Sequence, residues 1–269
     1  MSTVAAIRAA MATDVGRVRE HNEDAGLVSA HVVAVADGMG GHAAGEVASA
    51  LAVEALTALG DDEALRSRDV LAGVADANRA ILESVARHPE QRGMATTLAG
   101  LAQVMVGGAA HWAAFNIGDS RVYRVLDGQL AQVSQDHSEV GELVALGLLT
   151  PEEALRHPAR NIVTRCLGRD PLDPVDSWVF PPHPGERFLL CTDGLTNELR
   201  DPAIARLLLD GDDPQEIADR LVAAAVEAGG RDNVTVVVVL GTPGEAAAGD
   251  EADEETAPRT VRRGAEALR

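Results

Sequence analysis

The most informative stretch of this chain is His31-Val32-Val33-Ala34-Val35-Ala36-Asp37-Gly38-Met39-Gly40-Gly41-His42-Ala43-Ala44-Gly45-Glu46-Val47-Ala48-Ser49. Its apolar part, 32–36, is short, rich in valine and followed by glycines, which predicts a buried strand that delivers the Asp37 carboxylate to the edge of a sheet. A buried carboxylate needs a counter-charge, because without one it is driven to its neutral form. A divalent metal ion would supply that charge, so the stretch predicts a metal site.

The same arrangement recurs twice further along the chain. An apolar run over 187–192 ends in Asp193-Gly194, and Asp232-Asn233 precedes the valine-rich run 234–240. Three aspartates at strand ends predict one shared metal centre. Hard oxygen ligands with no cysteine or histidine among them favour Mg²⁺ or Mn²⁺ over Zn²⁺.

The composition predicts one domain and excludes two classes of partner. The chain has 269 residues, 46% of them hydrophobic, which is enough to bury a full core with a tail left over. Its formal charge is -19, and all 23 basic residues are arginine. A chain this acidic repels nucleic acid and anionic membranes, and no run of arginine is longer than two. We therefore expect neither a nucleic-acid partner nor a membrane partner.

The cysteine content and the start of the chain bear on its location. Cys166 and Cys191 are too few for a disulfide framework, and no cluster has the spacing of a zinc site. The amino terminus has no positively charged segment followed by a long apolar stretch, and no uninterrupted apolar run reaches about 18 residues. We expect a soluble, cytoplasmic protein that acts as a monomer.

Hydrophobic periodicity and turn signals predict the order of the helices and strands. Strands are expected between about residues 5 and 30, around the turn Asp14-Val15-Gly16. Further strands are predicted at 32–36, 97–106, 109–117, 121–126, 129–133, 175–180, 187–192 and 234–240. Helices are predicted at 44–59, 65–87, 139–146, 151–156, 202–209 and 214–228.

The four strands between residues 97 and 133 are separated by short glycine-containing turns. Asp127-Gly128 between two strand-like runs is a strong hairpin signal, so the block is expected to form an antiparallel meander. Runs of antiparallel strands with helices in pairs predict an α+β fold in which two sheets pack together with helices outside.

The end of the chain has a different composition. Beyond Gly241 it consists mainly of Ala, Gly, Glu, Asp, Thr and Pro. Such a segment cannot bury enough apolar surface to offset its ordering entropy, so 241–269 is predicted to be a disordered, acidic, alanine-rich tail. The alternative role for it is a docking or regulatory peptide.

Further segments place acids beside arginine or glycine. Arg19 closely precedes Asn22-Glu23-Asp24, which suits a site for a metal-bound oxyanion because arginine presents a rigid fork of donors to phosphate oxygens. Gly38 would let the backbone carbonyl approach a metal ion. Asp119 lies on a tight turn in Gly118-Asp119-Ser120-Arg121. Taken alone, the first segment is equally consistent with a solvated turn and the last with an ordinary turn.

Together these motifs resemble those of the metal-dependent protein Ser/Thr phosphatases, the PPM or type 2C family, in their bacterial form. The motifs are, in order, Arg19-x-x-Asn22-Glu23-Asp24, Asp37-Gly38-Met39-Gly40-Gly41-His42, Ala95-Thr96-Thr97, Gly118-Asp119-Ser120-Arg121, Asp193-Gly194 and Gly230-Arg231-Asp232-Asn233-Val234-Thr235. Each is weak alone, but six in order at this spacing are specific. The resemblance implies a phosphatase domain over 1–240, built as a four-layer α-β-β-α sandwich of two antiparallel sheets flanked by helix pairs.

The resemblance also implies a binuclear Mn²⁺ or Mg²⁺ site between the sheets. Asp37 would bridge the two ions and Gly38 would ligate through its carbonyl oxygen. Asp193 and Asp232 would hold the first ion.

The remaining site residues follow from the same resemblance. Glu23 and Asp24 would act on the second ion, largely through water. Asp119 and Asp193 would hold a weaker third ion, and Arg19 would bind the phosphate. The segment 135–170 is similar to the mobile flap near the site.

The histidines depart from the eukaryotic pattern. Many eukaryotic relatives place histidine directly after Asp-Gly as a proposed general acid, whereas this chain has Met39 there. His42, three residues later, is the candidate proton donor to the leaving group, and capping or packing at the helix start is its alternative role. We expect structural or solvated roles for His21, His137 and His157.

Thr96 and Thr97 could likewise have a catalytic or a structural role. Their β-branched side chains are typical of a strand start. We prefer that interpretation to a direct catalytic role.

The residues and the resemblance agree on phosphomonoester hydrolysis. Two cations can share a water, lower its pKa and position it for direct in-line attack on phosphorus, so no phosphoenzyme is needed. The resemblance alone implies a signalling role with phosphorylated proteins as substrates, bacterial Ser/Thr protein kinases among them. Two alternatives stay open, a pseudophosphatase that binds phosphoproteins without turnover and a hydrolase of a small phosphate ester.

Overall fold

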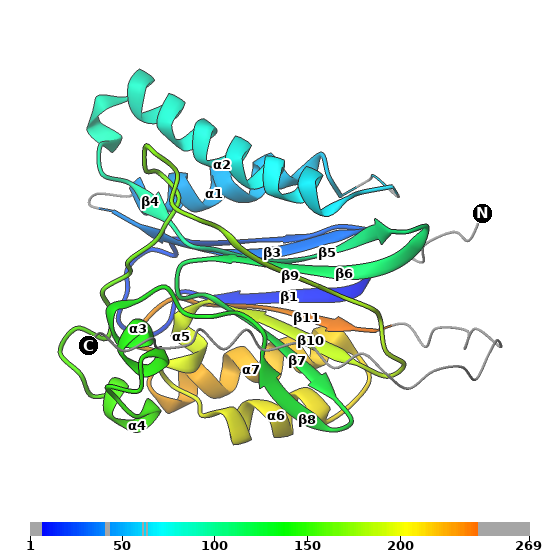
Figure 1. The fold of residues 1–269 in the computed structure, drawn as a ribbon. Coiled ribbons are helices and arrows are strands. Elements are labelled where there is room, and N and C mark those ends of the chain that lie inside the picture. The colour runs from blue at the N-terminus through cyan, green and yellow to red at the C-terminus, as the bar shows by residue number, and fades with distance from the viewer. Residues whose placement is uncertain (1–6, 41–43, 61, 63, 242–269) are drawn as a thin grey trace, which may run out of the picture.

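The computed structural model describes residues 7–40, 44–60, 62 and 64–241 of the chain. Two antiparallel β-sheets lie face to face, and helices cover the outer face of each sheet (Figure 1). These four layers confirm the predicted α+β sandwich. The predicted disordered tail lies outside the described residues from residue 242 onward, so its order stays a prediction.

One sheet has five strands in the order β1-β11-β10-β7-β8. Its strands are β1 (Arg8–Asp14), β7 (Arg121–Leu126), β8 (Gln129–Gln132), β10 (Arg187–Cys191) and β11 (Val234–Leu240). β11 is buried along its whole length because it lies between β1 and β10 and packs on both faces. Burial on both faces explains why its run of valines shows no alternation with polar residues.

The other sheet has the order β2-β3-β5-β6-β9, and β4 pairs with the end of β3. Its strands are β2 (Asp24–Val28), β3 (Val32–Met39), β4 (Ala95–Thr96), β5 (Leu98–Val106), β6 (Ala109–Ile117) and β9 (Asp176–Phe180). The strand predicted to carry Asp37 is therefore present, and it lies inside the sheet between β2 and β5.

The helices form two outer layers and a small group at one end of the sandwich (Figure 1). α1 and α2 cover the six-stranded sheet, α6 and α7 cover the five-stranded sheet, and α3 to α5 lie at the end where Asp37 is found. Their bounds are α1 (Ala44–Thr57), α2 (Ser67–Arg87), α3 (Glu139–Ala145), α4 (Pro151–Ala154), α5 (Asp193–Thr196), α6 (Asp201–Leu209) and α7 (Pro214–Ala228), with a 3-10 turn η1 at Pro89–Gln91. Each predicted helix is present within a few residues of its expected ends.

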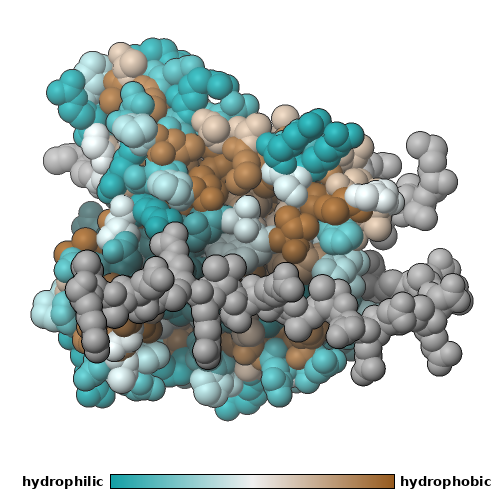
Figure 2. Space-filling model, viewed as in Figure 1, coloured by the Kyte–Doolittle hydropathy of each residue, from teal (hydrophilic) through white to brown (hydrophobic). Residues whose placement is uncertain are grey.

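Three hydrophobic clusters hold the layers together. One lies between α1, α2 and the six-stranded sheet, one between the two sheets, and one between the five-stranded sheet and α6 with α7. In Figure 2 hydrophobic residues gather in the middle band of the molecule, while hydrophilic residues dominate its top and bottom. Within the described part of the chain, no helix has the length and the apolar character needed to cross a bilayer.

The predicted meander over residues 97–133 is wrong. β5 pairs with β6 and β7 pairs with β8, but the two hairpins belong to different sheets. Both hairpins turn on two residues of positive φ, Gly107-Gly108 and Asp127-Gly128, which is the geometry that keeps a strand beside its predecessor. The link 118–120 instead carries the chain from one sheet to the other. Turn residues mark where a strand ends, but they do not tell which sheet receives the next strand.

Candidate metal centre

Asp37 lies near the end of β3, and its backbone is held by Thr96 at the end of β4 and by Thr97, which lies between β4 and β5. The Asp37 amide donates to Thr97 Oγ1 at 3.0 Å, and the Thr97 amide donates to the Asp37 carbonyl at 3.0 Å. Thr96 Oγ1 donates to the same carbonyl at 2.9 Å. The interpretation of the two threonines as a simple strand start is incomplete, because they position the central aspartate.

Gly38 follows at a point where three backbone segments meet. Its amide donates to the Glu23 carbonyl at 3.1 Å. A Cβ added to Gly38 would lie 2.2 Å from the Gly45 carbonyl oxygen, and a Cβ added to Gly45 would lie 2.8 Å from the Gly38 carbonyl carbon. Glycine is needed on both sides because β3 and the first turn of α1 touch through their backbones.

Asp24 comes from the neighbouring strand and lies directly opposite Asp37 in the pair β2–β3. Thr192 Oγ1 donates to Asp24 Oδ2 at 2.9 Å, while Asp24 Oδ1 is buried without a hydrogen-bond partner. Burial raises the pKa of Asp24 to about 7, and the charges of Asp193 and Asp232 add to the rise. A buried carboxylate oxygen without a donor is a group that a cation would satisfy.

Asp193 and Asp232 enter from the five-stranded sheet. Asp193 begins α5 directly after β10, and Asn197 Nδ2 donates to its Oδ2 at 3.0 Å. A Cβ on Gly194 would lie 1.9 Å from the Asn233 carbonyl oxygen, so the two Asp-containing segments touch. Asp232 forms an ion pair with Arg19, whose Nη2 donates to its Oδ2 at 2.8 Å.

Asn233 is a residue whose role the sequence reasoning missed. Its Nδ2 donates to the carbonyls of Val15 at 3.0 Å and His21 at 2.9 Å, and its Oδ1 accepts from the Glu23 amide at 2.8 Å. Asn233 therefore fixes the loop that carries Arg19 and Glu23 against the segment that carries Asp232. The signal available in the sequence was an amide side chain directly beside a candidate ligand.

Asp119 lies on the link between the two sheets. Gly118 has a φ of 108°, and a Cβ there would lie 2.5 Å from the Thr97 side chain, so the turn requires glycine. The pKa of Asp119 is raised to about 8, first by burial and then by the charges of Asp193 and Asp136. Asp119 is thus electrostatically part of the same cluster.

Five carboxylates from five separate stretches of sequence interact at this end of the sandwich. Burial is the first cause of the raised pKa of Asp37, and the next causes are the charges of Asp24, Asp193, Asp119 and Asp232 in that order. Burial and the charge of Asp232 also raise the pKa of Asp193. Mutual repulsion on this scale favours either protonation or a bound cation.

The donor set fits divalent cations that prefer oxygen. All five side chains offer carboxylate oxygens, one of which has no partner, and the Gly38 carbonyl stands beside them. Among the described residues, no three acidic, histidine or cysteine side chains close around a single point at ligand distance.

Two of the histidines, His137 and His21, do not join this cluster. His42 lies outside the described residues, so its proposed role as proton donor stays a prediction. His137 is buried, its Nδ1 accepts from the Gly118 amide at 3.1 Å and its Nε2 lies 3.1 Å from Asp176, as expected for a structural histidine. His21 is exposed and contributes its carbonyl to Asn233.

The segment 135–170 carries α3 and α4 beside the cluster. It is attached at both ends, since the His137 amide donates to the Gly118 carbonyl at 2.9 Å and the Gly168 amide donates to Asn78 Oδ1 at 2.7 Å. Between residues 139 and 165 only Val140 and Ala154 are buried. A cavity of about 910 Å³ opens between this segment and the start of α6, and Asp119 and Asp193 are among the residues that line it.

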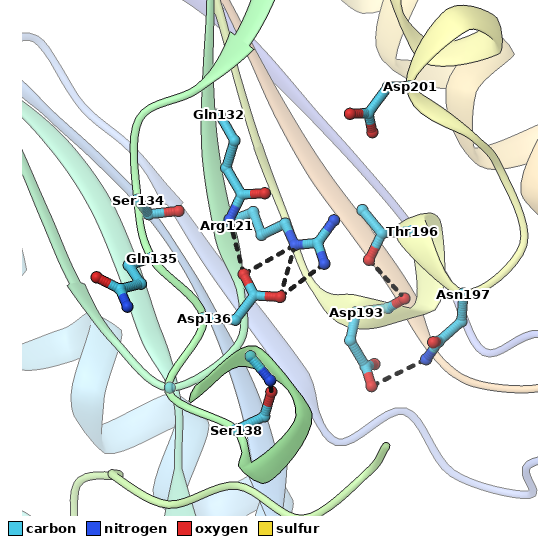
Figure 3. Close-up of polar contacts among 12 residues, drawn as sticks. Arg121, Gln132, Ser134, Gln135, Asp136, Ser138, Asp193, Thr196, Asn197 and Asp201 are labelled. Atoms are coloured by element: carbon cyan, nitrogen blue, oxygen red, sulfur yellow. Dashed lines mark hydrogen bonds and ion pairs between the residues drawn. The ribbon is translucent and has the colours of Figure 1, made fainter. Parts of the chain in front are cut away.

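Figure 3 shows the polar side of this cavity. Arg121 forms a forked ion pair with Asp136, with Nε and Nη2 donating at 2.6 to 3.1 Å, and Gln132 Nε2 donates to the same carboxylate at 2.7 Å. Asp193 and its partner Asn197 lie on the other side of Arg121. The cavity is thus continuous with the carboxylate cluster through Asp119 and Asp193.

Comparison with known proteins places the chain among phosphatases. The family model described as protein phosphatase 2C matches residues 17–222. The serine/threonine protein phosphatase PstP of Mycobacterium tuberculosis is 42% identical over 239 residues, which cover 86% of this chain and 44% of that protein. The chain therefore spans less than half the length of this curated relative.

Solved structures agree with the sequence match. The crystal structure of the M. tuberculosis phosphatase PstP/Ppp superposes with a TM-score of 0.81 at 40% identity, covering 87% of this chain and 98% of that one. The catalytic domain of PstP in complex with two manganese ions superposes with a TM-score of 0.80 at 38% identity, covering 88% of this chain and 99% of that one.

Proposed function

Because this chain belongs to the protein phosphatase 2C family, we propose that it is a metal-dependent phosphatase that removes phosphate from serine and threonine residues of proteins. The observation that carries the proposal is the cluster of Asp24, Asp37, Asp119, Asp193 and Asp232 beside Arg19, in which burial and the neighbouring carboxylates raise the pKa of the first four. The relative that was crystallised with two manganese ions supports the choice of Mn²⁺ or Mg²⁺ as cofactor.

In this proposal six carboxylates and one backbone carbonyl would hold two ions and a weaker third. Asp37, the Gly38 carbonyl, Asp193 and Asp232 would hold the first pair of ions together with Glu23 and Asp24, which would act on the second ion through water. Asp119 would join Asp193 at the third. When bound, the ions would make a water acidic enough to act as a nucleophile near neutral pH.

Arg19 orients the substrate in this mechanism. Its guanidinium is half exposed and uses Nη2 for Asp232, which leaves further N–H donors of the fork free to bind phosphate oxygens. Holding the phosphate between Arg19 and the cations that Asp37 would ligate would align the scissile bond and neutralise charge on the equatorial oxygens. Burial lowers the pKa of Arg19, but the charge and hydrogen bond of Asp232, followed by the charges of Asp37 and Glu23, raise it above its ordinary value, so the side chain stays cationic.

The proton that the leaving alkoxide needs is assigned to His42, which stays a prediction from the sequence. Thr96, Thr97 and Asn233 act only by positioning the residues that bind. Phosphorylated proteins are the proposed substrates, and the names of the relatives as Ser/Thr phosphatases support this choice. Ser/Thr kinases among these substrates stay a prediction from the sequence.

A direct test measures hydrolysis of para-nitrophenyl phosphate and of a phosphothreonine peptide with Mn²⁺, with EDTA, and with Asp37→Asn. We expect Mn²⁺-dependent release of phosphate from both substrates and loss of most turnover in the variant. Peptide binding without turnover would identify a pseudophosphatase. Turnover of the small ester with no activity on any phosphopeptide would identify a hydrolase of small phosphate esters.

A further inference from the structure

The cavity beside the carboxylate cluster has room for more than the target phosphate. Its volume is about 910 Å³, and it is lined by α3, α4 and the start of α6 together with Asp119 and Asp193. A sphere of that volume is about 12 Å across, which an extended peptide covers in about three or four residues. A substrate segment flanking the target residue would therefore fit in it.

Most acidic side chains that line the cavity already have a partner or a proposed role. Asp136 is neutralised by the forked ion pair with Arg121, and Asp201 accepts from the Tyr123 hydroxyl at 3.2 Å at the first turn of α6. Asp119 and Asp193 belong to the proposed metal centre. Asp136 is therefore charge-paired and Asp119 with Asp193 would be balanced by bound cations, whereas the Tyr123 hydroxyl that donates to Asp201 carries no charge.

Three further arginines line the cavity and, unlike Arg121, have no carboxylate partner among the described residues. Arg156, Arg160 and Arg200 line the cavity and are exposed, and none of them forms an ion pair with any residue that the structure describes. Nearby arginines are paired, since Arg165 contacts Asp176 at 3.4 Å and Arg169 contacts Asp173 at 3.4 Å. In a chain with a formal charge of -19, three unpaired guanidinium groups around one cavity form a local cationic site.

We propose that this cavity binds a second phosphorylated residue of the substrate, within about three or four residues of the one being hydrolysed. The proposal rests on the proposed phosphatase function. A phosphate dianion offers three acceptor oxygens to several guanidinium forks, which a single carboxylate cannot match. Glu152 is the one cavity carboxylate without an assigned partner in the described chain, and the three unpaired arginines outnumber it.

The test compares three phosphothreonine peptides with Mn²⁺ present. One has a single phosphothreonine, one has a second phosphothreonine three residues before or after the first, and one has glutamate at that second position. We expect kcat/KM to be about tenfold higher or more for the doubly phosphorylated peptide than for the singly phosphorylated one, because charge-assisted hydrogen bonds are worth that factor. The ratio is corrected for the two cleavable groups of the doubly phosphorylated peptide. In the R156Q/R160Q/R200Q variant the ratio should fall to about one.

A matched control separates this effect from general charge. Arg206 lies on α6, is exposed, does not line the cavity and forms no ion pair within the described chain, so Arg206→Gln should keep the wild-type ratio. Equal rates on the singly and doubly phosphorylated peptides would overturn the inference while leaving the phosphatase function intact. An equal gain from glutamate would overturn the assignment to phosphate. A wild-type protein inactive on both peptides and on para-nitrophenyl phosphate would overturn the proposed function itself.

Discussion

Asp24 and Asp37 face each other as a direct cross-strand pair in β2–β3, with one Asp24 oxygen buried and unpartnered. Two carboxylates on neighbouring strands would normally be avoided, because like charges opposite each other destabilise a sheet. Here three more carboxylates approach the same point. The fold therefore carries an electrostatic cost that a cation would remove, and the first two predictions measure that cost.

Removing one charge should stabilise the metal-free protein. We expect Asp37→Asn to raise the free energy of unfolding in EDTA near pH 8, because burial and the neighbouring carboxylates raise the pKa of Asp37 and disfavour its charged form in the folded state. The same variant should lose most of the stabilisation that Mn²⁺ gives the wild type. Urea unfolding in EDTA and in Mn²⁺ measures both, with Glu54→Gln as the control, because Glu54 is exposed and forms no ion pair within the described chain. Loss of stability in EDTA would contradict the prediction.

The pH dependence of stability has a definite sign. The folded-state pKa is raised to about 7 for Asp24 and to about 8 for Asp119, above the usual 3.8 of an unfolded chain. Between those values the folded state holds more protons than the unfolded state, so these groups favour folding at about pH 4 and lose that contribution as pH rises to about 8. Metal binding releases the same protons, so the Mn²⁺-induced rise in Tm should be larger at about pH 8 than at about pH 6. A rise that is independent of pH, or that shrinks with pH, would count against the cluster.

Arg19 should contribute to substrate binding and not to metal binding. Its ion pair with Asp232 is partly exposed and is worth only about 0.2–1 kcal/mol, so Arg19→Ala should leave the Mn²⁺ affinity nearly unchanged. Loss of charge-assisted hydrogen bonds to phosphate should lower kcat/KM for a phosphopeptide about 10- to 150-fold. Calorimetry with Mn²⁺ and steady-state kinetics separate the two effects. Arg17→Ala is the control, because Arg17 is exposed and forms no ion pair within the described chain.

The Thr97 hydroxyl should contribute more to stability and to kcat than the Thr97 methyl group does. Thr97→Val would leave the Asp37 amide and Ser120 Oγ without their partner, at a cost of about 1–3 kcal/mol of stability. Misplacement of Asp37 should also lower kcat in saturating Mn²⁺. Thr97→Ser keeps the hydroxyl and should retain most activity. Equal losses in the serine and valine variants would show that packing, and not the hydrogen bond, is what Thr97 provides.

The segment 135–170, the predicted flap, should exchange its amide protons at rates that differ along its length. Residues 141–162 bury little apolar surface and should exchange faster than the strands β3 and β10. The amide of Gly168 should be slower than that middle part, because it donates to the buried Asn78 side chain at 2.7 Å. Hydrogen exchange followed by mass spectrometry resolves the three regions. Protection of 141–162 equal to that of β3 would exclude a mobile flap.

The parts of this molecule that the sequence predicts are those that local patterns encode. Asp37 and Asp193 each come directly after an apolar run and Asp232 directly before one, so strand edges could be read from periodicity and glycine. The role of Thr97 could not, because it depends on a hydrogen bond across 60 positions of sequence. The division of 97–133 between two sheets was missed for the same reason, since strand pairing depends on contacts distant in sequence.

The contacts of Asn233 have a consequence for how the protein is made. This side chain, only a few residues from the end of the last strand, secures the loop near the amino terminus that carries Arg19 and Glu23. Synthesis on the ribosome runs from the amino terminus, so the nascent chain exposes its early acids long before Asp232 and Asn233 emerge. The centre can therefore assemble only after Asp232 and Asn233 have left the ribosome, because a shorter nascent chain lacks both the proposed ligand and the side chain that holds the Arg19 loop.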